Sequence, residues 1–482
     1  MGGSQSNAID FAARMRDQGH QVMVCAPPGP LVDRVRHRRL PFTPFEPHAP
    51  HVSLRASREL LRVARGFRAD LVHGYEYYPS MEGWLGPTLQ GDIPSVSTVL
   101  TMWLPLLPSR MPLVVGTESL AAVARARRRG PVRCIEPPVD VDHDAVDAPG
   151  VKPERFRDTW GIDPGVHTLV LVSRLEQDLK VDGIERAIEA VPLLETDLPV
   201  QLVIVGDGAA RPDLDRRAMA VNERVGRRSV VLTGELPDPR SAYAAADLVL
   251  GMGSSILRGM SFGKPAIVVG RKGFSEPIGP DTLPRFLYDG FIGVGLAGDA
   301  LSGAELIDAL RDLQDGAGPV RTGDPGARRL AGQIATILGS RQEAERRGEF
   351  ALQTVRTRYS LEVLTDALLE VYEEALRSPM PRAEILADSA VTWSRKTAGR
   401  TKSKTLRVLA AAGNLRVGAP RRSDRVHLPG ASGLRDRFDG AAHPAAVGIA
   451  HRPAVEPEGL QREQGPAREV DQRLGQADRR QP

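Results

Sequence analysis

The sequence predicts an α/β protein with two doubly wound parallel sheets, followed by a disordered tail. Short apolar runs alternate with segments of helical period, first before residue 142 and again after residue 167. This alternation is typical of parallel sheets covered by helices on both faces. A chain of 482 residues is long enough for two or three domains.

The most informative stretch is 169–190, LVLVSRLEQDLKVDGIERAIEA. The run 169–172 predicts a buried strand, and 181–191 predicts an amphipathic helix. Arg174 and Lys180 stand between them at the carboxyl end of the strand, where open parallel sheets bind ligands. Two cations beside a helix N-terminus suit a diphosphate, because the helix adds backbone N–H groups and the positive end of its dipole. The alternative is a pair of solvated surface cations.

The amino-terminal series begins with a Gly-Gly-Ser loop, a predicted helix over 7–18 and the strand QVMVCA. In a doubly wound sheet, a strand normally precedes such a loop and helix. We expect either a start codon assigned too late or a sheet that lacks its first strand; the helix needs a sheet to pack on, which favours the first. Further strands are predicted at 69–75 and 94–100, and at the starts of 112–130 and 132–142.

The second series predicts strands in 200–208, 229–236 and 264–276, and helices at 211–224, 254–263, 301–315 and 341–377. These elements divide the chain into a first domain over 1–142, a linker over 143–166, a second domain over 167–344, a helix over 345–377 and a tail over 378–482. The tail is rich in Arg, Ala, Gly, Pro and Gln, so it buries too little apolar surface to offset its ordering entropy, although helical fragments are compatible with 383–413.

Composition restricts the partners. The net charge is +4, and the arginines at 125–129 (RARRR) and in the last hundred residues are too dispersed for a nucleic-acid footprint. No signal peptide and no apolar run of about 18–20 residues is visible. Two cysteines without disulfide or metal spacing agree with a reducing, cytoplasmic setting. RARRR either rests weakly on anionic lipid at the inner face of the membrane or forms a solvated face, which the composition favours.

Two further motifs bear on ligand binding. Gly206 and Gly208 form a lone G-x-G at a strand-to-helix turn, with Arg211 where a dinucleotide fingerprint has its third glycine, so they equally suit a tight turn. Ser254 and Ser255 begin a helix, where hydroxyl caps and unpaired N–H groups suit an anion. In the exit loop after 264–270, a carboxylate, Glu276, either accepts hydrogen bonds from sugar hydroxyls or belongs to the surface.

Five motifs in order, SRLEQDLKVDGI, VIVGDGAARPDL, LTGELPDPRSAYAAADLVL, SSILRGMSFGKPAIVVG and GFSEPI, resemble the carboxyl-terminal half of GT-B-fold glycosyltransferases of the retaining, family-4 type. GGSQSNAIDFAARMRDQGHQV and IEPPVDVD resemble the amino-terminal half of the same family. The resemblance covers roughly residues 1–377. It implies two Rossmann-like domains that face a cleft, with the acceptor on 1–140 and the donor on 169–276.

The resemblance implies roles for matching residues. Arg174 and Lys180 would contact the donor diphosphate and stabilise the leaving nucleotide, because fixed cations lower the energy of a developing negative charge. The helix over 345–377 would cross back to the first domain. The other implied positions are the glycine loop opposite the donor (Gly2, Gly3), the loop beside the base (Gly234 to Leu236), the helix start facing the phosphates (Ser254 to Leu257) and the carboxylate near the sugar (Glu276).

Two departures from the family pattern affect the site. The family carries two glutamates eight positions apart; here Arg258 replaces the second and Leu250 stands near the first, so an added phosphate contact from Arg258 is the alternative to a ribose-binding carboxylate. Leu100 stands where a strand-end histidine usually contacts the donor sugar. His73 is the nearest replacement on the acceptor side, although a strand-end histidine is more often structural.

These observations predict a retaining, metal-independent glycosyltransferase whose co-substrate is a nucleotide-diphosphate sugar and which needs no further cofactor. The acceptor would be a glycan, a lipid-linked molecule or a small metabolite. Arg258 and Leu100 motivate an alternative, a degenerate GT-B protein that binds a nucleotide sugar or a partner without transfer. A nicotinamide-dependent oxidoreductase is disfavoured, because the third fingerprint glycine is missing.

Overall fold

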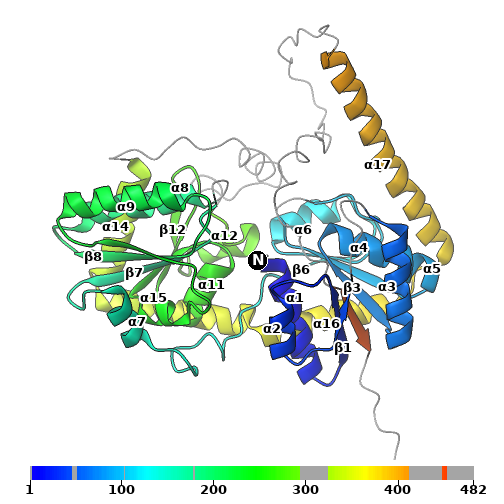
Figure 1. Ribbon diagram of the computed structural model, residues 1–482, viewed down its shortest axis with the longest axis horizontal. Helices are drawn as coiled ribbons and strands as arrows, with labels where there is room; N and C mark the ends of the chain where they lie inside the picture. The colour runs from blue at the N-terminus through cyan, green and yellow to red at the C-terminus, as the bar shows by residue number, and fades with distance from the viewer. Residues whose placement is uncertain are drawn as a thin grey trace, which may run out of the picture.

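The computed structural model describes residues 3–45, 52–101, 104–176, 180–293, 324–411 and 448–452. Figure 1 shows two sheet-and-helix halves side by side, with the amino terminus between them. One sheet has the order β2-β1-β13-β3-β4-β5-β6 and the other β12-β11-β10-β7-β8-β9. The predicted fold of two parallel sheets is confirmed.

The first half is assembled mainly from residues before 140. Its strands are β1 (Gln21–Ala26), β2 (Phe42–Pro44), β3 (Leu71–Tyr75), β4 (Ser95–Val99), β5 (Leu113–Val115) and β6 (Val132–Cys134). Its helices are α1 (Gly3–Asp17), α2 (Val32–His37), α3 (Leu54–Phe67), α4 (Tyr77–Gly83), α5 (Leu89–Gly91) and α6 (Glu118–Arg125), with a π-helical turn at Trp84–Thr88. Thr117 caps α6 by accepting a hydrogen bond from Leu120 N at 3.3 Å.

The second half follows the predicted series closely. Its strands are β7 (His167–Val172), β8 (Val200–Val205), β9 (Val230–Gly234), β10 (Leu248–Gly251), β11 (Ala266–Val269) and β12 (Ser275–Pro277). Its helices are α7 (Pro153–Trp160), α8 (Val181–Leu194), α9 (Arg211–Val225), α10 (Arg240–Ala245), α11 (Ser254–Ser261), α12 (Leu283–Asp289), α14 (Pro325–Leu338) and α15 (Arg341–Thr354). The helix predicted over 301–315 lies outside the described residues.

The structure differs from the prediction in two segments, the linker and the helix that crosses between the halves. Residues 143–166 contain α7, and its Phe156 packs in the core of the second half. The single helix predicted over 341–377 is instead α15, a π-helical turn at Val355–Tyr359, and α16 (Leu361–Arg377). Ala351 of α15 packs in the second half, whereas Leu368 of α16 packs in the first.

The first sheet has a strand where the sequence suggested a missing one. β13 (Gly448–Arg452) lies between β1 and β3 and runs antiparallel to both. The tail also begins with a long helix, α17 (Arg382–Ala411), in the segment where helical fragments were expected. The sequence did not predict β13, because a single short apolar run inside a polar tail carries no pairing signal.

No helix among the described residues combines the length and the apolar character needed to cross a bilayer. The two cysteines are free thiols, Cys25 buried and Cys134 half-buried. Burial raises the pKa of the Cys25 thiol to about 12. The Cys25 thiol therefore contributes to packing.

Glu82 of α4 gives the fold a pH dependence. Its side chain is buried, and burial raises its pKa from 4.5 to about 7. Between these values the unfolded chain has released the proton and the folded chain retains it, so the free energy of unfolding falls as pH rises, by about 3 kcal/mol in all. We expect Glu82→Gln to flatten the decline between pH 5 and 8, measured by urea unfolding. Glu349→Gln, at an exposed position of α15, should leave the wild-type slope, and an equal slope in both variants would contradict the assignment.

Candidate functional site

The second sheet reverses its strand order at β7. The chain moves from β7 to β8 and β9 on one side, then returns to place β10 on the other side of β7. Loops that leave β7 and β10 therefore diverge, and this opens a crevice at the carboxyl ends of the strands, the usual ligand position in such sheets. Leu250 of β10 pairs with Leu171 of β7, so Arg174 and the start of α11 leave from adjacent strands.

Arg174 and Lys180 lie close enough to interact at this crevice. Arg174 is exposed, and Lys180 is the residue that precedes α8. Burial lowers the pKa of Lys180, and repulsion from Arg174 lowers it further, while Glu176 acts in the opposite direction. A bound anion would relieve this repulsion, so the pair is suited to a phosphate group.

Glycines allow the neighbouring loops to pack against the end of β7. Gly206 has φ +148°, and a Cβ built there would lie 1.8 Å from Ser173 O. Gly208 has φ +156°, and its Cβ would lie 2.5 Å from Leu175 O. Leu175 N also donates to Asp207 O at 2.9 Å. The G-x-G therefore serves a tight turn, one of the two readings that the sequence left open.

The first turn of α11 faces the same crevice without a side-chain cap. Gly253 precedes the helix with φ 60° and makes no capping hydrogen bond through a side chain. Ser255 Oγ donates to Met252 O at 2.8 Å, and Ser254 is exposed. The predicted serine cap is therefore wrong, because the Ser255 hydroxyl turns back to the preceding loop.

The loop after β9 lies on the other side of β7. Gly234 has φ 82°, and its carbonyl accepts a hydrogen bond from Gly206 N at 2.9 Å. Leu236 packs partly against the core of the second half. Arg211 reaches over this turn, with Nη1 2.8 Å from Asp207 Oδ2. Contact of Gly234 and Leu236 with a nucleotide base stays a prediction.

Glu276 lies on the edge strand β12, and not in a loop as the sequence suggested. β12 pairs antiparallel with β11, and Glu276 is opposite Val268. Burial raises the pKa of its carboxyl more than nearby Arg285, Arg329 and Arg347 lower it. These arginines occupy the surroundings of the carboxylate, and its contact with a donor sugar stays a prediction.

The first half places its predicted residues differently. Gly3 begins α1, so the expected loop is helical from this residue, and Gly2 lies outside the described residues. His73 of β3 is fully buried, with Nδ1 2.6 Å from Tyr372 Oη and Nε2 2.7 Å from Thr98 Oγ1. Burial lowers its pKa to about 3. The imidazole is thus a neutral core group and has no free surface for an acceptor.

The sequence did not point to Glu76, which directly follows β3. It lies at the end of the strand, beside Ser4 in the first turn of α1. Its carboxylate accepts hydrogen bonds from Leu100 N at 3.1 Å and Thr101 Oγ1 at 3.3 Å. Leu100 is the position where the family usually has its histidine. A polar residue directly after an apolar strand was the available signal, the same signal that identified Arg174.

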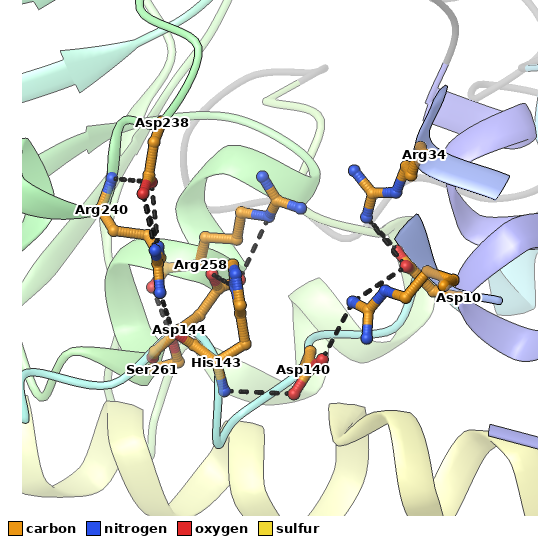
Figure 2. Close-up of polar contacts among 10 residues, drawn as sticks. Asp10, Arg34, Asp140, His143, Asp144, Asp238, Arg240, Arg258 and Ser261 are labelled. Carbon is orange, nitrogen blue, oxygen red and sulfur yellow. Dashed lines mark hydrogen bonds and ion pairs between the residues drawn. The ribbon is translucent and has the colours of Figure 1, made fainter. Parts of the chain in front are cut away.

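A cavity of about 280 Å³ lies between the halves, beside the connecting segment 138–144. Figure 2 shows Asp10 and Arg34 on one side of it and Asp238, Arg240 and Arg258 on the other. Its charged lining consists of four arginines, four aspartates and one histidine: Asp10, Arg34, Arg38, Asp140, His143, Asp144, Asp238, Arg240 and Arg258.

Arginines tie the connecting segment to both halves. Arg38 Nη2 lies 3.3 Å from Asp10 Oδ1 and 3.2 Å from Asp140 Oδ2. Arg258 Nε lies 3.3 Å from Asp144 Oδ2, in a carboxylate that is only 4% exposed (Figure 2). The buried carboxylate requires a cation, so Arg258 serves the connecting segment, where the sequence suggested an added phosphate contact. Within the described residues, no cluster of three or more His, Cys, Asp or Glu could hold a metal ion.

The arrangement defines a two-domain α/β protein whose second half has a crevice flanked by the cations Arg174 and Lys180. A model of the family described as Glycosyltransferase Family 4 matches residues 1–143, and one described as Glycosyl transferases group 1 matches residues 166–291. A comparison with curated proteins found no match.

Solved structures share the fold over about three-quarters of the chain. A glycosyltransferase from Rickettsia africae is 17% identical with a TM-score of 0.58, over 78% of this chain and 96% of its own. Anabaena HepE in complex with UDP is 18% identical with a TM-score of 0.54, over 77% and 96%. The chain therefore belongs to the GT-B glycosyltransferases of the family 4 type.

The contacts of His73 predict that its substitution lowers stability and leaves the proposed donor site intact. We expect His73→Phe to lower the free energy of unfolding by about 2 kcal/mol, because it leaves the hydroxyls of Tyr372 and Thr98 without these partners. Combining it with Tyr372→Phe should cost less than the sum of the two single changes, measured by urea unfolding. A stable His73→Phe protein that loses transfer activity would instead support the acceptor-side role.

Proposed function

We propose that this glycosyltransferase retains anomeric configuration and moves a sugar from a uridine-diphosphate donor, bound by the second half, to an acceptor on the first half. The observation that carries the proposal is the crevice between β7 and β10. Two cations follow β7, and an α-helix without a side-chain cap follows β10. Fixed cations and backbone N–H groups are the chemistry that binds a diphosphate.

The same groups supply catalysis. When the bond between the sugar and the diphosphate breaks, negative charge develops on the leaving oxygen. Arg174, Lys180 and the first N–H groups of α11 would stabilise this charge, and a site closed to water strengthens their effect. The proposal therefore assigns neutralisation of the diphosphate to side chains and helix, with no metal ion required.

The choice of a uridine nucleotide rests on the similarity to a solved structure. HepE of Anabaena has been solved with UDP and with UDP-glucose, and its fold extends over 77–78% of this chain. These ligands make UDP and UDP-glucose the first compounds to test. The alternative, a protein that binds a nucleotide sugar without transfer, is favoured by Arg258, because a cation directed at Asp144 stands where the family has a glutamate.

The crevice makes a direct prediction about nucleotide binding. We expect UDP at about 100 times its dissociation constant to raise the free energy of unfolding by roughly 2.7 kcal/mol. The gain should disappear in Arg174→Ala/Lys180→Ala, because the diphosphate loses both cations. Thermal unfolding with UDP, GDP, ADP, TDP and NAD measures this.

The control is Arg216→Ala, at an exposed position of α9, which should keep the full shift. UDP release from UDP-glucose then separates the two functions. UDP release that depends on Arg174 supports transfer. UDP binding without UDP release, whichever acceptor is added, supports the binding-only alternative. An unchanged UDP shift in the double variant would contradict the site.

We further propose that the first half contacts an anionic membrane surface. Exposed Leu386, Val391 and Trp393 lie on α17, and residues 392–411 contain six Lys or Arg and no Asp or Glu. Figure 1 shows this helix projecting from the first half. Basic residues beside exposed apolar and aromatic ones are typical of helices that lie at a lipid interface.

The RARRR segment lies near the anchored start of α17. Arg129 N and Gly130 N donate to Ser109 O, and Ser109 Oγ donates to Asp388 of α17 at 2.8 Å. Arg127 and Arg129 are exposed. The basic segment 125–129 therefore lies beside the start of the helix that carries the second basic segment, and this supports lipid over a solvated face.

The surface predicts charge-dependent vesicle binding. We expect the wild type to float with vesicles that contain phosphatidylglycerol and not with pure phosphatidylcholine, with less binding as salt increases. Arg127→Glu/Arg129→Glu/Trp393→Ala should remove most of it, whereas Arg341→Glu, at an exposed position of α15, should not. Equal binding to both vesicle types would contradict the proposal.

A further inference from the structure

The cavity between the halves is lined by arginines and aspartates in equal number, yet it offers more hydrogen-bond donors than acceptors. A guanidinium carries five N–H groups, whereas a carboxylate has about four acceptor positions. Four residues of each kind line the cavity, so their contacts with one another leave N–H groups over. This surplus favours a ligand that only accepts hydrogen bonds.

The carboxylates of the first half and the connecting segment already have donors. Asp10 accepts hydrogen bonds from Arg34 Nη2 at 2.8 and 2.7 Å, one to each oxygen, and Arg38 Nη2 lies 3.3 Å from the same carboxylate. Asp140 pairs with Arg38 and also accepts a hydrogen bond from His143 N at 3.2 Å. A backbone N–H thus uses acceptor capacity too, which increases the excess of arginine N–H groups.

The two arginines of the second half differ in how much of their donor capacity is used. Arg240 donates to Asp238 through Nε and Nη2, at 2.9 and 2.7 Å, and to His143 O through Nη1 at 3.1 Å, so all three nitrogens have a partner. Arg258 approaches Asp144 with Nε at 3.3 Å. Its two Nη atoms form no hydrogen bond with another described residue, so the outer edge of this guanidinium remains open.

Arg34 and Arg258 direct their remaining N–H groups into the cavity from opposite halves. Arg34 belongs to α2 and Arg258 to α11, and both line the cavity. Arg34 bonds Asp10 through Nη2 alone, and its Nε has no hydrogen-bond partner within the described residues. Figure 2 shows the two guanidinium groups on either side of the space between the halves. Two like charges that face one space repel each other, and an anion between them removes the repulsion.

We propose that this cavity binds a phosphoryl group, held between Arg34 of the first half and Arg258 of the second. Planar guanidinium groups bind phosphate oxygens in pairs. A tetrahedral phosphoryl group presents oxygens to both arginines at once, whereas the two oxygens of a carboxylate lie on one side of its carbon. The cavity of about 280 Å³ is close to the lower end of ligand pockets, about 300 Å³, so it suits a phosphate or a sugar monophosphate.

The phosphoryl site is a neighbour of the proposed donor crevice and distinct from it. The described lining of the cavity includes neither Arg174 nor Lys180. The two sites share α11, because Arg258 lies four residues after Ser254, and one turn of a helix rises about 5.4 Å. Since one arginine comes from each half, a phosphoryl group between them would favour the arrangement in which the halves approach each other.

Two sources of this phosphoryl group have the same chemistry. It belongs either to a phosphorylated acceptor or to a free phosphate that favours closure. The first source rests on the proposed function, in which the sugar passes to a hydroxyl of the acceptor. That transfer releases UDP and a proton and leaves the phosphoryl group intact.

Inorganic phosphate tests the site without turnover. Isothermal titration calorimetry on Arg174→Ala/Lys180→Ala removes the cations of the donor crevice, which would offer phosphate a second site. We expect saturable binding, weakened at least about 10-fold when Arg34→Gln is added, because charged hydrogen bonds are lost. The added change should not unfold the protein, since Asp10 keeps its pair with Arg38.

The matched control is Arg36→Gln in the same background, at an exposed position of α2, which should leave phosphate binding unchanged. Arg258→Lys keeps a cation for Asp144 and loses the planar group, so it should weaken binding as Arg34→Gln does. Absence of saturable binding, or equal weakening by Arg36→Gln, would overturn the inference. A UDP shift in the wild type without phosphate binding would leave the proposed function standing, and phosphate binding without a UDP shift would do the reverse.

UDP release from UDP-glucose by the wild type separates the two sources. A phosphorylated acceptor predicts faster release with glucose 1-phosphate or glucose 6-phosphate than with glucose, a phosphorylated disaccharide as product, and a KM raised at least about 10-fold in Arg34→Gln. A free phosphate predicts that inorganic phosphate alters the rate and is not consumed. A rate that responds to none of these phosphates would overturn a role for the site in transfer.

Discussion

The reversal of strand order at β7 is the constraint on which the proposed donor site depends. Leu169, Val170 and Leu171 are fully buried between helices on both faces of the sheet, so β7 is fixed at the centre. Only at such a reversal do successive loops diverge and leave a crevice that backbone groups do not fill. The role proposed for Arg174 and Lys180 depends on this place, because the same two cations on an outer strand would be solvated and screened.

The first half depends on segments that come late in the chain. α16 returns from the second half and buries Leu364, Leu368 and Tyr372 against the first sheet. The Tyr372 hydroxyl meets His73 inside the core, which joins residues 299 positions apart through one hydrogen bond. β13 fills the space between β1 and β3 from still further along the chain. Removal of residues after 360 would therefore expose the first sheet, although its strands precede residue 140.

Periodicity and strand-end position predicted the elements and the donor crevice, because both depend on local sequence. Arg174 was recognisable because it ends an apolar run, whereas the pairing of Arg258 with Asp144 was not. That pairing depends on how α11 meets the connecting segment, which no local pattern encodes. The positive φ of Glu76, 67°, was equally hidden, since it arises where β3, β4 and α4 meet. Edge-strand placement of Glu276 required knowledge of an antiparallel pairing.

The chain passes between the halves twice, at Val139 and at Tyr359. The contacts at these two crossings are weaker than the apolar packing within each half. Val139 N donates to Tyr359 O and Leu361 N donates to Val139 O, each at 2.8 Å, so the crossings are bonded to each other. The ion pair of Arg38 with Asp140 beside them joins side chains that are 32% and 25% exposed. Exposed pairs contribute about 0–1 kcal/mol each, far less than the burial of an apolar helix face. A rotation of one half against the other would therefore preserve the packing of α16 and exchange exposed contacts such as this one, as the proposed transfer requires of a cleft that closes over a donor and opens to release its product.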